Sequence, residues 1–162
     1  MILQPGDKAP DFVLPDADMK PVRSEDLFGQ GNIVLCFYPR SDTPGCTLTA
    51  LAFTDLQTEF EAEQTEVIAI SRDTCADHGK FRDKHGLTIR LLADIDGEIC
   101  DAYGVLCTKK INGIPHISVL RSSFIIDRSG HIRYALYDAK PKGHAEHVLD
   151  LVQYINAVER TI

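Results

Sequence analysis

The stretch from Asn32 to Thr47 reads NIVLCFYPRSDTPGCT, and it decides the fold. Residues 32–38 form a continuous run of β-branched and aromatic residues, which is typical of a strand buried on both faces in a partly parallel sheet. Pro39 ends this strand. Apolar residues then recur at the 3.6-residue period of a helix that runs to about Ala62, and they are Leu48, Leu51, Ala52, Leu56 and Phe60. The pattern predicts a strand that leads directly into a helix, with Cys46 at the junction.

The rest of the chain supplies further strands and helices. Residues 11–22, with Pro15 and Pro21 inside and Pro10 just before them, predict an edge hairpin at most. After the first helix we expect a strand over 66–70, a helix over 75–85 capped by Asp73 or Thr74, a strand over 90–93 and a short helix near 99–103. Residues 105–117 show no clear period and contain Gly113 and Pro115, which predicts an irregular loop. Two strands around the turn 127–130 follow, and an apolar stripe from Ala145 to Ile155 predicts a final helix.

This order of elements predicts an α/β protein with the thioredoxin-like fold, a central mixed β-sheet flanked by helices on both faces. At 162 residues the chain is close to the usual size of one domain, so we expect a single domain over 1–162. In open sheets of this kind, ligands bind beyond the carboxyl ends of the parallel strands. The expected site is therefore the turn from Pro39 to Cys46.

Composition and charge exclude several classes of function. Hydrophobic residues make up 44% and charged residues 25%, as in ordinary globular proteins. The longest apolar runs are about six residues, far short of the roughly 20 that cross a bilayer. The N-terminus lacks a basic segment followed by an apolar one, so we expect a cytoplasmic protein. The net charge is −7 and the longest basic run is Lys109-Lys110, which argues against binding to nucleic acid or to a membrane surface.

Five cysteines, with no pair spaced as C-x-x-C, predict free thiols rather than a disulfide framework. Cys46 is placed for reactivity, because the N–H groups and the dipole of a helix N-terminus stabilise a thiolate. The alternative is a buried structural cysteine, since free cysteine is among the most buried residue types. Cys75 and His78 form half of a zinc-binding pattern, but no second pair follows, so we expect no metal. No nucleotide or haem motif is present, and no cofactor is expected.

The residues around Cys46 resemble the active-site motif of peroxiredoxins, in which a proline, three residues, Thr or Ser, two residues and the peroxidatic cysteine follow one another. Pro39, Thr43 and Cys46 match this pattern. The sequence is also similar at 6–12, 70–73 and 121–127, and the resemblance, closest to the Q-type subfamily called bacterioferritin comigratory protein, spans nearly the whole chain. It implies a thiol-dependent peroxidase for hydrogen peroxide and organic hydroperoxides, active in antioxidant defence.

The mechanism implied by the resemblance is attack of the Cys46 thiolate on a peroxide, which gives a sulfenic acid. Lowering a thiol pKa from about 8.5 to about 6 gains roughly tenfold in thiolate and loses roughly tenfold in nucleophilicity. The rate therefore depends on donors that hold the peroxide and stabilise the leaving oxygen. The family assigns this work to Thr43, Arg121 and the N–H groups of Gly45 and Cys46, with Pro39 shielding the thiolate. Outside this resemblance, an arginine that opens a strand is usually an exposed surface charge.

The sequence departs from many relatives at the residue that resolves the sulfenic acid. Their resolving cysteine lies five residues after the first, where this chain has Leu51. Cys75 is the candidate resolving cysteine, because it begins the helix after the neighbouring strand, and Cys100 and Cys107 of the same or another chain are alternatives. We expect instead a one-cysteine mechanism, with thioredoxin, glutaredoxin or a small thiol as reductant, in a monomer or weak homodimer. Cys36 is expected to be a core residue.

Two other functions compete with the peroxidase. A thioredoxin-like thiol–disulfide oxidoreductase needs a cysteine three residues before or after Cys46, where the chain has Thr43 and Thr49. This function is therefore disfavoured. A redox sensor that passes oxidation to a partner would use the same Cys46, and the sequence does not separate it from a peroxidase.

Overall fold

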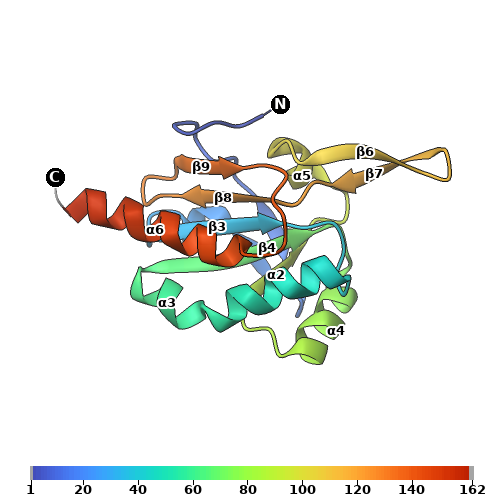
Figure 1. Ribbon diagram of the computed structural model, residues 1–162, viewed down its shortest axis with the longest axis horizontal. Helices are drawn as coiled ribbons and strands as arrows, with labels where there is room; N and C mark the ends of the chain where they lie inside the picture. Colours follow the sequence, from blue (N-terminus) through green and yellow to red (C-terminus); the bar gives the residue numbers. More distant parts are fainter. Residues whose placement is uncertain (1, 161–162) are drawn as a thin grey trace.

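The computed structural model describes residues 2–160 and places a five-stranded mixed sheet at the centre of the molecule (Figure 1). The strand order is β5-β4-β3-β8-β9. β3 is parallel to β4 and antiparallel to β8, β4 is parallel to β5, and β8 is antiparallel to β9. The bounds of these strands are Asn32–Phe37 for β3, Thr65–Ser71 for β4, Arg90–Ala93 for β5, Ser122–Ile126 for β8 and Ile132–Leu136 for β9. The expected thioredoxin-like α/β architecture is confirmed.

The first strand–helix–strand unit fixes the place of the site. All six residues of β3 are buried, as the continuous apolar run predicts for a central strand. Phe37 at its end is level with Ile70 of β4 and with Ser122 of β8. The carboxyl end of β3, the carboxyl end of β4 and the start of β8 therefore meet at one edge of the sheet.

Two hydrophobic cores lie on the two faces of the sheet. One face is covered by α2 (Pro44–Asp55), α3 (Gln57–Ala62), α4 (Cys75–His85) and α6 (His144–Arg160). The other face packs against the N-terminal segment, the hairpin of β1 (Val13–Pro15) and β2 (Pro21–Arg23), and the short helices α1 (Ser24–Leu27) and α5 (Glu98–Ala102). Helices lie on both faces, as expected, although the long ones share one face.

The long helix expected up to Ala62 is interrupted. The structure ends α2 at Asp55 and begins α3 at Gln57, with the non-helical Leu56 between them. The predicted inward stripe is wrong at Leu48, which is 51% exposed, whereas Phe60 is buried and Leu51, Ala52 and Leu56 are partly buried against the core. The residues of α2 that face the sheet are Cys46, Thr49, Ala50 and Phe53. Packing of the first turn of α2 against the sheet directs Cys46 inward and turns Leu48 to the surface.

The loop expected over 105–117 is instead a β-hairpin, formed by β6 (Leu106–Ile111) and β7 (Ile114–Val119). Its turn residues Asn112 and Gly113 both have positive φ, 53° and 79°, and Asn-Gly is a preferred pair for a tight hairpin turn. The two strands pair only with each other and extend away from the body (Figure 1). Without a core beneath its outer part, the hairpin needs no alternation of apolar and polar residues. The sequence pattern therefore missed it.

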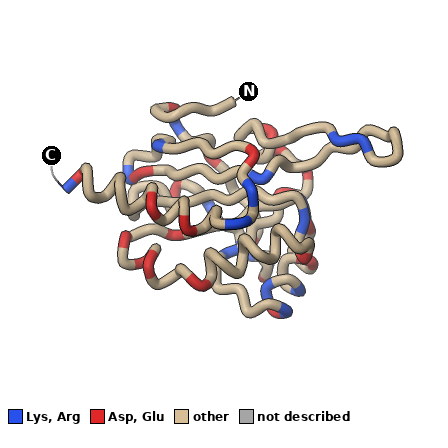
Figure 2. Tube along the Cα trace, viewed as in Figure 1, with Lys and Arg blue, Asp and Glu red and all other residues tan. Residues whose placement is uncertain are grey.

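The short helix α1 was not predicted. The remaining predicted elements agree with expectation, and the cap at Gly86 has the left-handed φ of 62° that ends α4. Within residues 2–160, every helix is too short or too polar to traverse a lipid bilayer. Acidic and basic residues are mixed over most of the trace, but the hairpin carries only basic ones (Figure 2), since the sequence has no Asp or Glu between residues 102 and 126.

Candidate active site

The first turn of α2 places Cys46 at the carboxyl edge of the sheet. Thr43 has extended backbone angles and precedes the helix, and Pro44 occupies the first helical position, where a missing N–H costs nothing. Cys46 is the third residue of the helix and is 2% exposed. The unpaired N–H groups of this turn and the positive end of the helix dipole therefore surround a nearly buried thiol.

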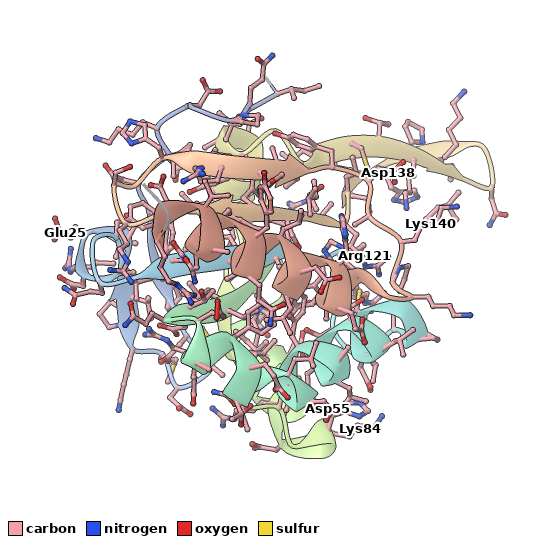
Figure 3. The ribbon with its side chains drawn as sticks, turned by 60° about the vertical axis from the view of Figure 1, so that its left-hand side comes forward. Glu25, Asp55, Lys84, Arg121, Asp138 and Lys140 are labelled. Atoms are coloured by element: carbon pink, nitrogen blue, oxygen red, sulfur yellow. The ribbon has the colours of Figure 1, made fainter. Side chains whose placement is uncertain are left out.

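Arg121 meets Cys46 from the other side of the site. It directly precedes β8, whose first residue, Ser122, lies beside the end of β3. Its Nη2 group donates a hydrogen bond to the Cys46 sulfur over 3.2 Å. Its Nε group is buried and has no hydrogen-bond partner among residues 2–160. Arg121 as a whole is half-buried, and Figure 3 shows it beside the loop that carries Asp138 and Lys140. A cation in this place stabilises a thiolate and keeps one donor available for a ligand.

The backbone at Gly45 leaves room for this contact. A Cβ atom there would lie 3.0 Å from Arg121 Nη2 and 3.0 Å from Pro141 Cγ. Both distances are shorter than ordinary van der Waals contacts, so a larger residue would displace the guanidinium from the sulfur.

The turn before α2 carries the two other predicted residues. Pro39 is half-buried directly after Tyr38, and Thr43 is half-buried at the start of α2. The Thr43 hydroxyl donates to the Arg40 carbonyl oxygen over 3.0 Å and does not cap the helix. The structure thus brings Pro39, Thr43 and Cys46, from one continuous segment, and Arg121, from a second, to the same sheet edge.

A buried hydrogen-bond network beneath this turn was missed from the sequence. The Tyr38 hydroxyl contacts His78 Nδ1 at 2.9 Å and the Ser41 hydroxyl at 3.1 Å. His78 Nε2 lies 3.2 Å from the Ser71 hydroxyl, which donates to Asp73 over 2.7 Å. Asp73 also accepts the backbone N–H of Ser41 over 2.7 Å. The network ties the turn before α2 to β4 and α4.

His78 is the centre of this network and is fully buried. Burial lowers its pKa, so the ring is neutral at neutral pH. Burial also raises the pKa of Tyr38, which keeps the phenol protonated as a donor. Sequence analysis considered His78 only as half of a zinc-binding pattern with Cys75. The signal that could have found it is the pairing of a tyrosine in a fully buried strand with a histidine on an inward helix face, since both need buried partners.

A second buried pair lies on the other side of Cys46. The Ser123 hydroxyl is 2.7 Å from His144 Nε2, and it also hydrogen-bonds to the thiol of Cys36, its cross-strand neighbour. Burial lowers the pKa of His144 to about 4, with smaller contributions from His147 and Arg121. Burial raises the pKa of Cys36 to about 11.

The other cysteines occupy different places, and none forms a disulfide. Cys75 is half-buried at the start of α4, after β4, as predicted. Cys100 is buried in α5, in the core on the opposite face of the sheet from Cys46. Cys107 lies in β6 and not in the expected irregular loop.

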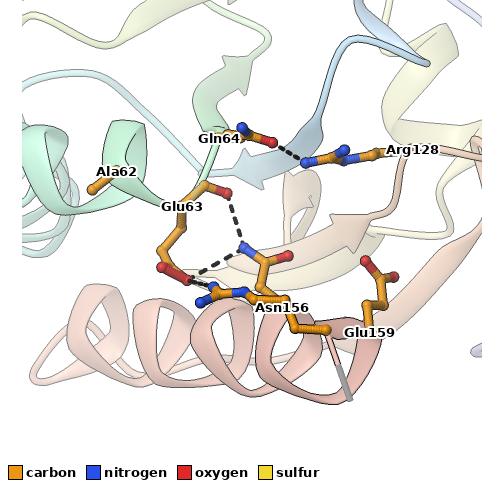
Figure 4. A pocket seen from close by; sticks show the side chains of 7 residues that line it. Ala62, Glu63, Gln64, Arg128, Asn156 and Glu159 are labelled. Carbon is orange, nitrogen blue, oxygen red and sulfur yellow. Dashed lines mark hydrogen bonds and ion pairs between the residues drawn. The ribbon is translucent and has the colours of Figure 1, made fainter. Parts of the chain in front are cut away.

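Residues 2–160 contain no group of three or more metal-ligating side chains. A polar cavity of about 520 Å³ lies at the C-terminal end of α6, away from the end of α6 that contacts the site (Figures 1 and 4). Its side chains bond to one another, because Asn156 and Arg160 both donate to Glu63. These hydrogen bonds across the cavity link α6 to the turn before β4.

Comparisons with known proteins give consistent matches. Residues 5–135 match the AhpC/TSA family. The chain is 36% identical over 148 residues to Peroxiredoxin Bcp of Escherichia coli, covering 91% of this chain and 94% of that protein. A crystal structure of a Xylella fastidiosa PrxQ mutant superposes with a TM-score of 0.89 at 30% identity, covering 95% of this chain and 98% of the other. The bacterioferritin comigratory protein of Xanthomonas campestris, studied for alkyl peroxide reduction, gives 0.85 at 28% identity, covering 90% and 92%.

Proposed function

Since the chain belongs to the AhpC/TSA family and is a peroxiredoxin, a thiol peroxidase that reduces alkyl hydroperoxides and hydrogen peroxide, we propose that Cys46 is the residue that attacks the peroxide. The observation that carries this assignment is the 3.2 Å hydrogen bond from Arg121 to the Cys46 sulfur at the N-terminus of α2. A guanidinium and a helix N-terminus that converge on one thiol favour its thiolate form.

The geometry supports the following chemical step. The Cys46 thiolate attacks the terminal oxygen of the peroxide, the O–O bond breaks, and the electron pair leaves with the second oxygen. Arg121 and the N–H groups of Gly45 and Cys46 stabilise the charge that develops on this oxygen, which leaves as water or an alcohol after protonation. Thr43 orients the peroxide and Pro39 shields the thiolate from water. Cys46 is left as a sulfenic acid.

We propose that an outside thiol then reduces the sulfenic acid, without an obligatory internal disulfide. Leu51 replaces the cysteine found there in many relatives, and Cys100 lies in the core on the opposite face of the sheet. Thioredoxin, glutaredoxin and a small thiol are the candidate reductants. We also propose a cytoplasmic protein of one domain over residues 1–162 that is a monomer or weak homodimer. The continuous sheet supports the single domain.

The experiment that tests the assignment is replacement of Cys46 by serine. We expect Cys46→Ser to abolish peroxide consumption in the presence of dithiothreitol, because the serine hydroxyl is not ionised at neutral pH. Cys75→Ser is the matched control, since it changes a half-buried cysteine at another helix start, and it should keep full activity. Substantial activity in Cys46→Ser would assign the reaction to another residue.

The same protein distinguishes the peroxidase from a redox sensor. A peroxidase consumes many equivalents of peroxide with dithiothreitol alone, whereas a dedicated sensor needs its partner for each cycle. We expect multiple turnovers, because Arg121 and the N–H groups of α2 form a site for the reacting oxygens and not only for the thiol.

A further inference from the structure

Cys36 is the one other cysteine, within residues 2–160, that belongs to the same hydrophobic core as Cys46. Cys100 packs in the opposite core, and Cys75 and Cys107 lie outside both cores, half-buried. The sequence drew attention to these three as partners for Cys46 and treated Cys36 as inert. In the tertiary structure, Cys36 and none of these three cysteines shares the hydrophobic core of Cys46.

Cys36 and Cys46 line the same small cavity, together with Thr49, Ala50 and Phe53 of α2. Its volume is about 10 Å³, at the lower limit for one water molecule. The Ser123 hydroxyl bonds to Cys36 from the adjacent strand, and His144 in turn contacts Ser123 at 2.7 Å. Cys36 is thus held by a partner of its own, beside the site of oxidation.

We propose that, when no outside thiol is available, the sulfenic acid of Cys46 condenses with Cys36 to form a disulfide within the core. This inference rests on the proposed role of Cys46. The Cys36 sulfur attacks the Cys46 sulfur, the S–O bond breaks, and the hydroxyl group leaves as water with the thiol proton. Both oxidising equivalents come from the peroxide already consumed, so no further oxidant is needed.

The condensation is slow compared with reduction by an outside thiol. Burial raises the pKa of the Cys36 thiol to about 11, so only a very small fraction of molecules carries the thiolate at pH 7. The disulfide is therefore a protected resting form and not a step of every turnover. It keeps Cys46 from further oxidation to the irreversible sulfinic acid when peroxide is present and reductant is scarce.

The test uses tryptic peptides, because trypsin separates the relevant cysteines. Cys36 falls in peptide 24–40, Cys46 in 41–72, Cys75 in 73–80, and both Cys100 and Cys107 in 91–109. Reduced protein receives one equivalent of hydrogen peroxide without reductant. Samples taken over time are treated with dimedone and iodoacetamide and analysed by non-reducing mass spectrometry. We expect the dimedone adduct on 41–72 to fall while a disulfide between 24–40 and 41–72 rises.

Two variants at Cys36 and one control complete the design. In Cys36→Ala and in the nearly isosteric Cys36→Ser, the dimedone-reactive Cys46 should persist, and excess peroxide should convert it to sulfinic acid. Cys100→Ala makes the same deletion in the opposite core and should form the disulfide like wild type. All variants should retain turnover with dithiothreitol, which separates this inference from the assignment of Cys46.

Three results would overturn the proposal. They are a disulfide that joins 41–72 to 73–80 or to 91–109, a dimedone adduct that decays equally fast in the Cys36 variants, and a wild-type adduct that never decays. If wild-type Cys46 gives no oxidised product at all while peroxide is consumed, the assignment of Cys46 fails and this inference fails with it.

Discussion

At the scale of single residues, the site depends on one contact that joins distant parts of the chain. Arg121 and Cys46 are 75 residues apart in sequence, and their hydrogen bond exists only because β3 and β8 are neighbours in the sheet. The half-buried Arg121 has one Nη group on the sulfur and a buried Nε group without a hydrogen-bond partner among residues 2–160. Its effect should therefore appear in the rate of peroxide reduction.

We predict that Arg121→Ala lowers the second-order rate of peroxide reduction by about 10²-fold or more, as expected for loss of one transition-state donor. Stopped-flow measurement of peroxide reduction checks this rate. Arg121→Lys keeps the charge without the planar fork and should recover only part of the rate. Equal rates in wild type and Arg121→Ala would make Arg121 a structural residue.

At the scale of elements, the turn between β3 and α2 is fixed from below by the network of Tyr38, Ser41, Ser71, Asp73 and His78. Asp73 is the connecting group, since it accepts hydrogen bonds from the turn and from β4. Thr74, and not Asp73, caps α4 by accepting the N–H of Asp77. Asp73 and Thr74, which the sequence analysis gave as alternative caps of this helix, thus have different roles.

We predict that Asp73→Ala slows peroxide reduction by about tenfold, because the turn that carries Pro39 and Thr43 loses its anchor at Ser41. The loss of two hydrogen bonds to a carboxylate should also lower the free energy of unfolding by about 2–3 kcal/mol. Thr74→Ala is the control, since it removes a helix cap at a cost of about 1 kcal/mol without touching the turn. Its peroxidase rate should remain that of wild type, whereas an equal slowing in both variants would show a general effect of α4.

At the scale of the whole molecule, two buried histidines couple stability to pH. Burial lowers the pKa of His144 to about 4 and also lowers that of His78. In the unfolded chain a histidine has a pKa of about 6.5, so between about pH 6.5 and 4 the unfolded state binds more protons than the folded state. The contribution of the neutral histidines to the free energy of unfolding is therefore fully present above this pH window and is lost as the pH falls through it.

We predict that the free energy of unfolding decreases between pH 7 and pH 4, with up to about 3 kcal/mol of the loss attributable to His144. Urea unfolding at several pH values, followed by circular dichroism, measures this dependence. His144→Gln keeps a polar partner for Ser123 without the titration, and its stability should change less over the same range. A slope identical to that of wild type would exclude His144 as a source of the dependence.

The sequence by itself predicted a mixed sheet, most of its strands and helices along the chain, and the position of Cys46 at the start of a helix. These features follow from local patterns, namely the apolar run over 32–38 and the helical stripe over 145–155. Such patterns did not predict the exposed elements, because only burial of one face imposes a regular alternation of apolar and polar residues. The hairpin of β6 and β7 is exposed on its outer part, and only the turn residues Asn112 and Gly113 marked it.

Only the tertiary structure decided which residues accompany Cys46. Sequence similarity pointed to Arg121, but the contact itself depends on the pairing of β3 with β8. His78 and Cys36 were not predicted as parts of the site, because the relation between a strand and a helix that packs on it leaves no spacing in the sequence. The face of the sheet on which each cysteine side chain lies decides which cysteine shares a cavity with Cys46. A local pattern in the sequence carries no information on the distances between separate elements.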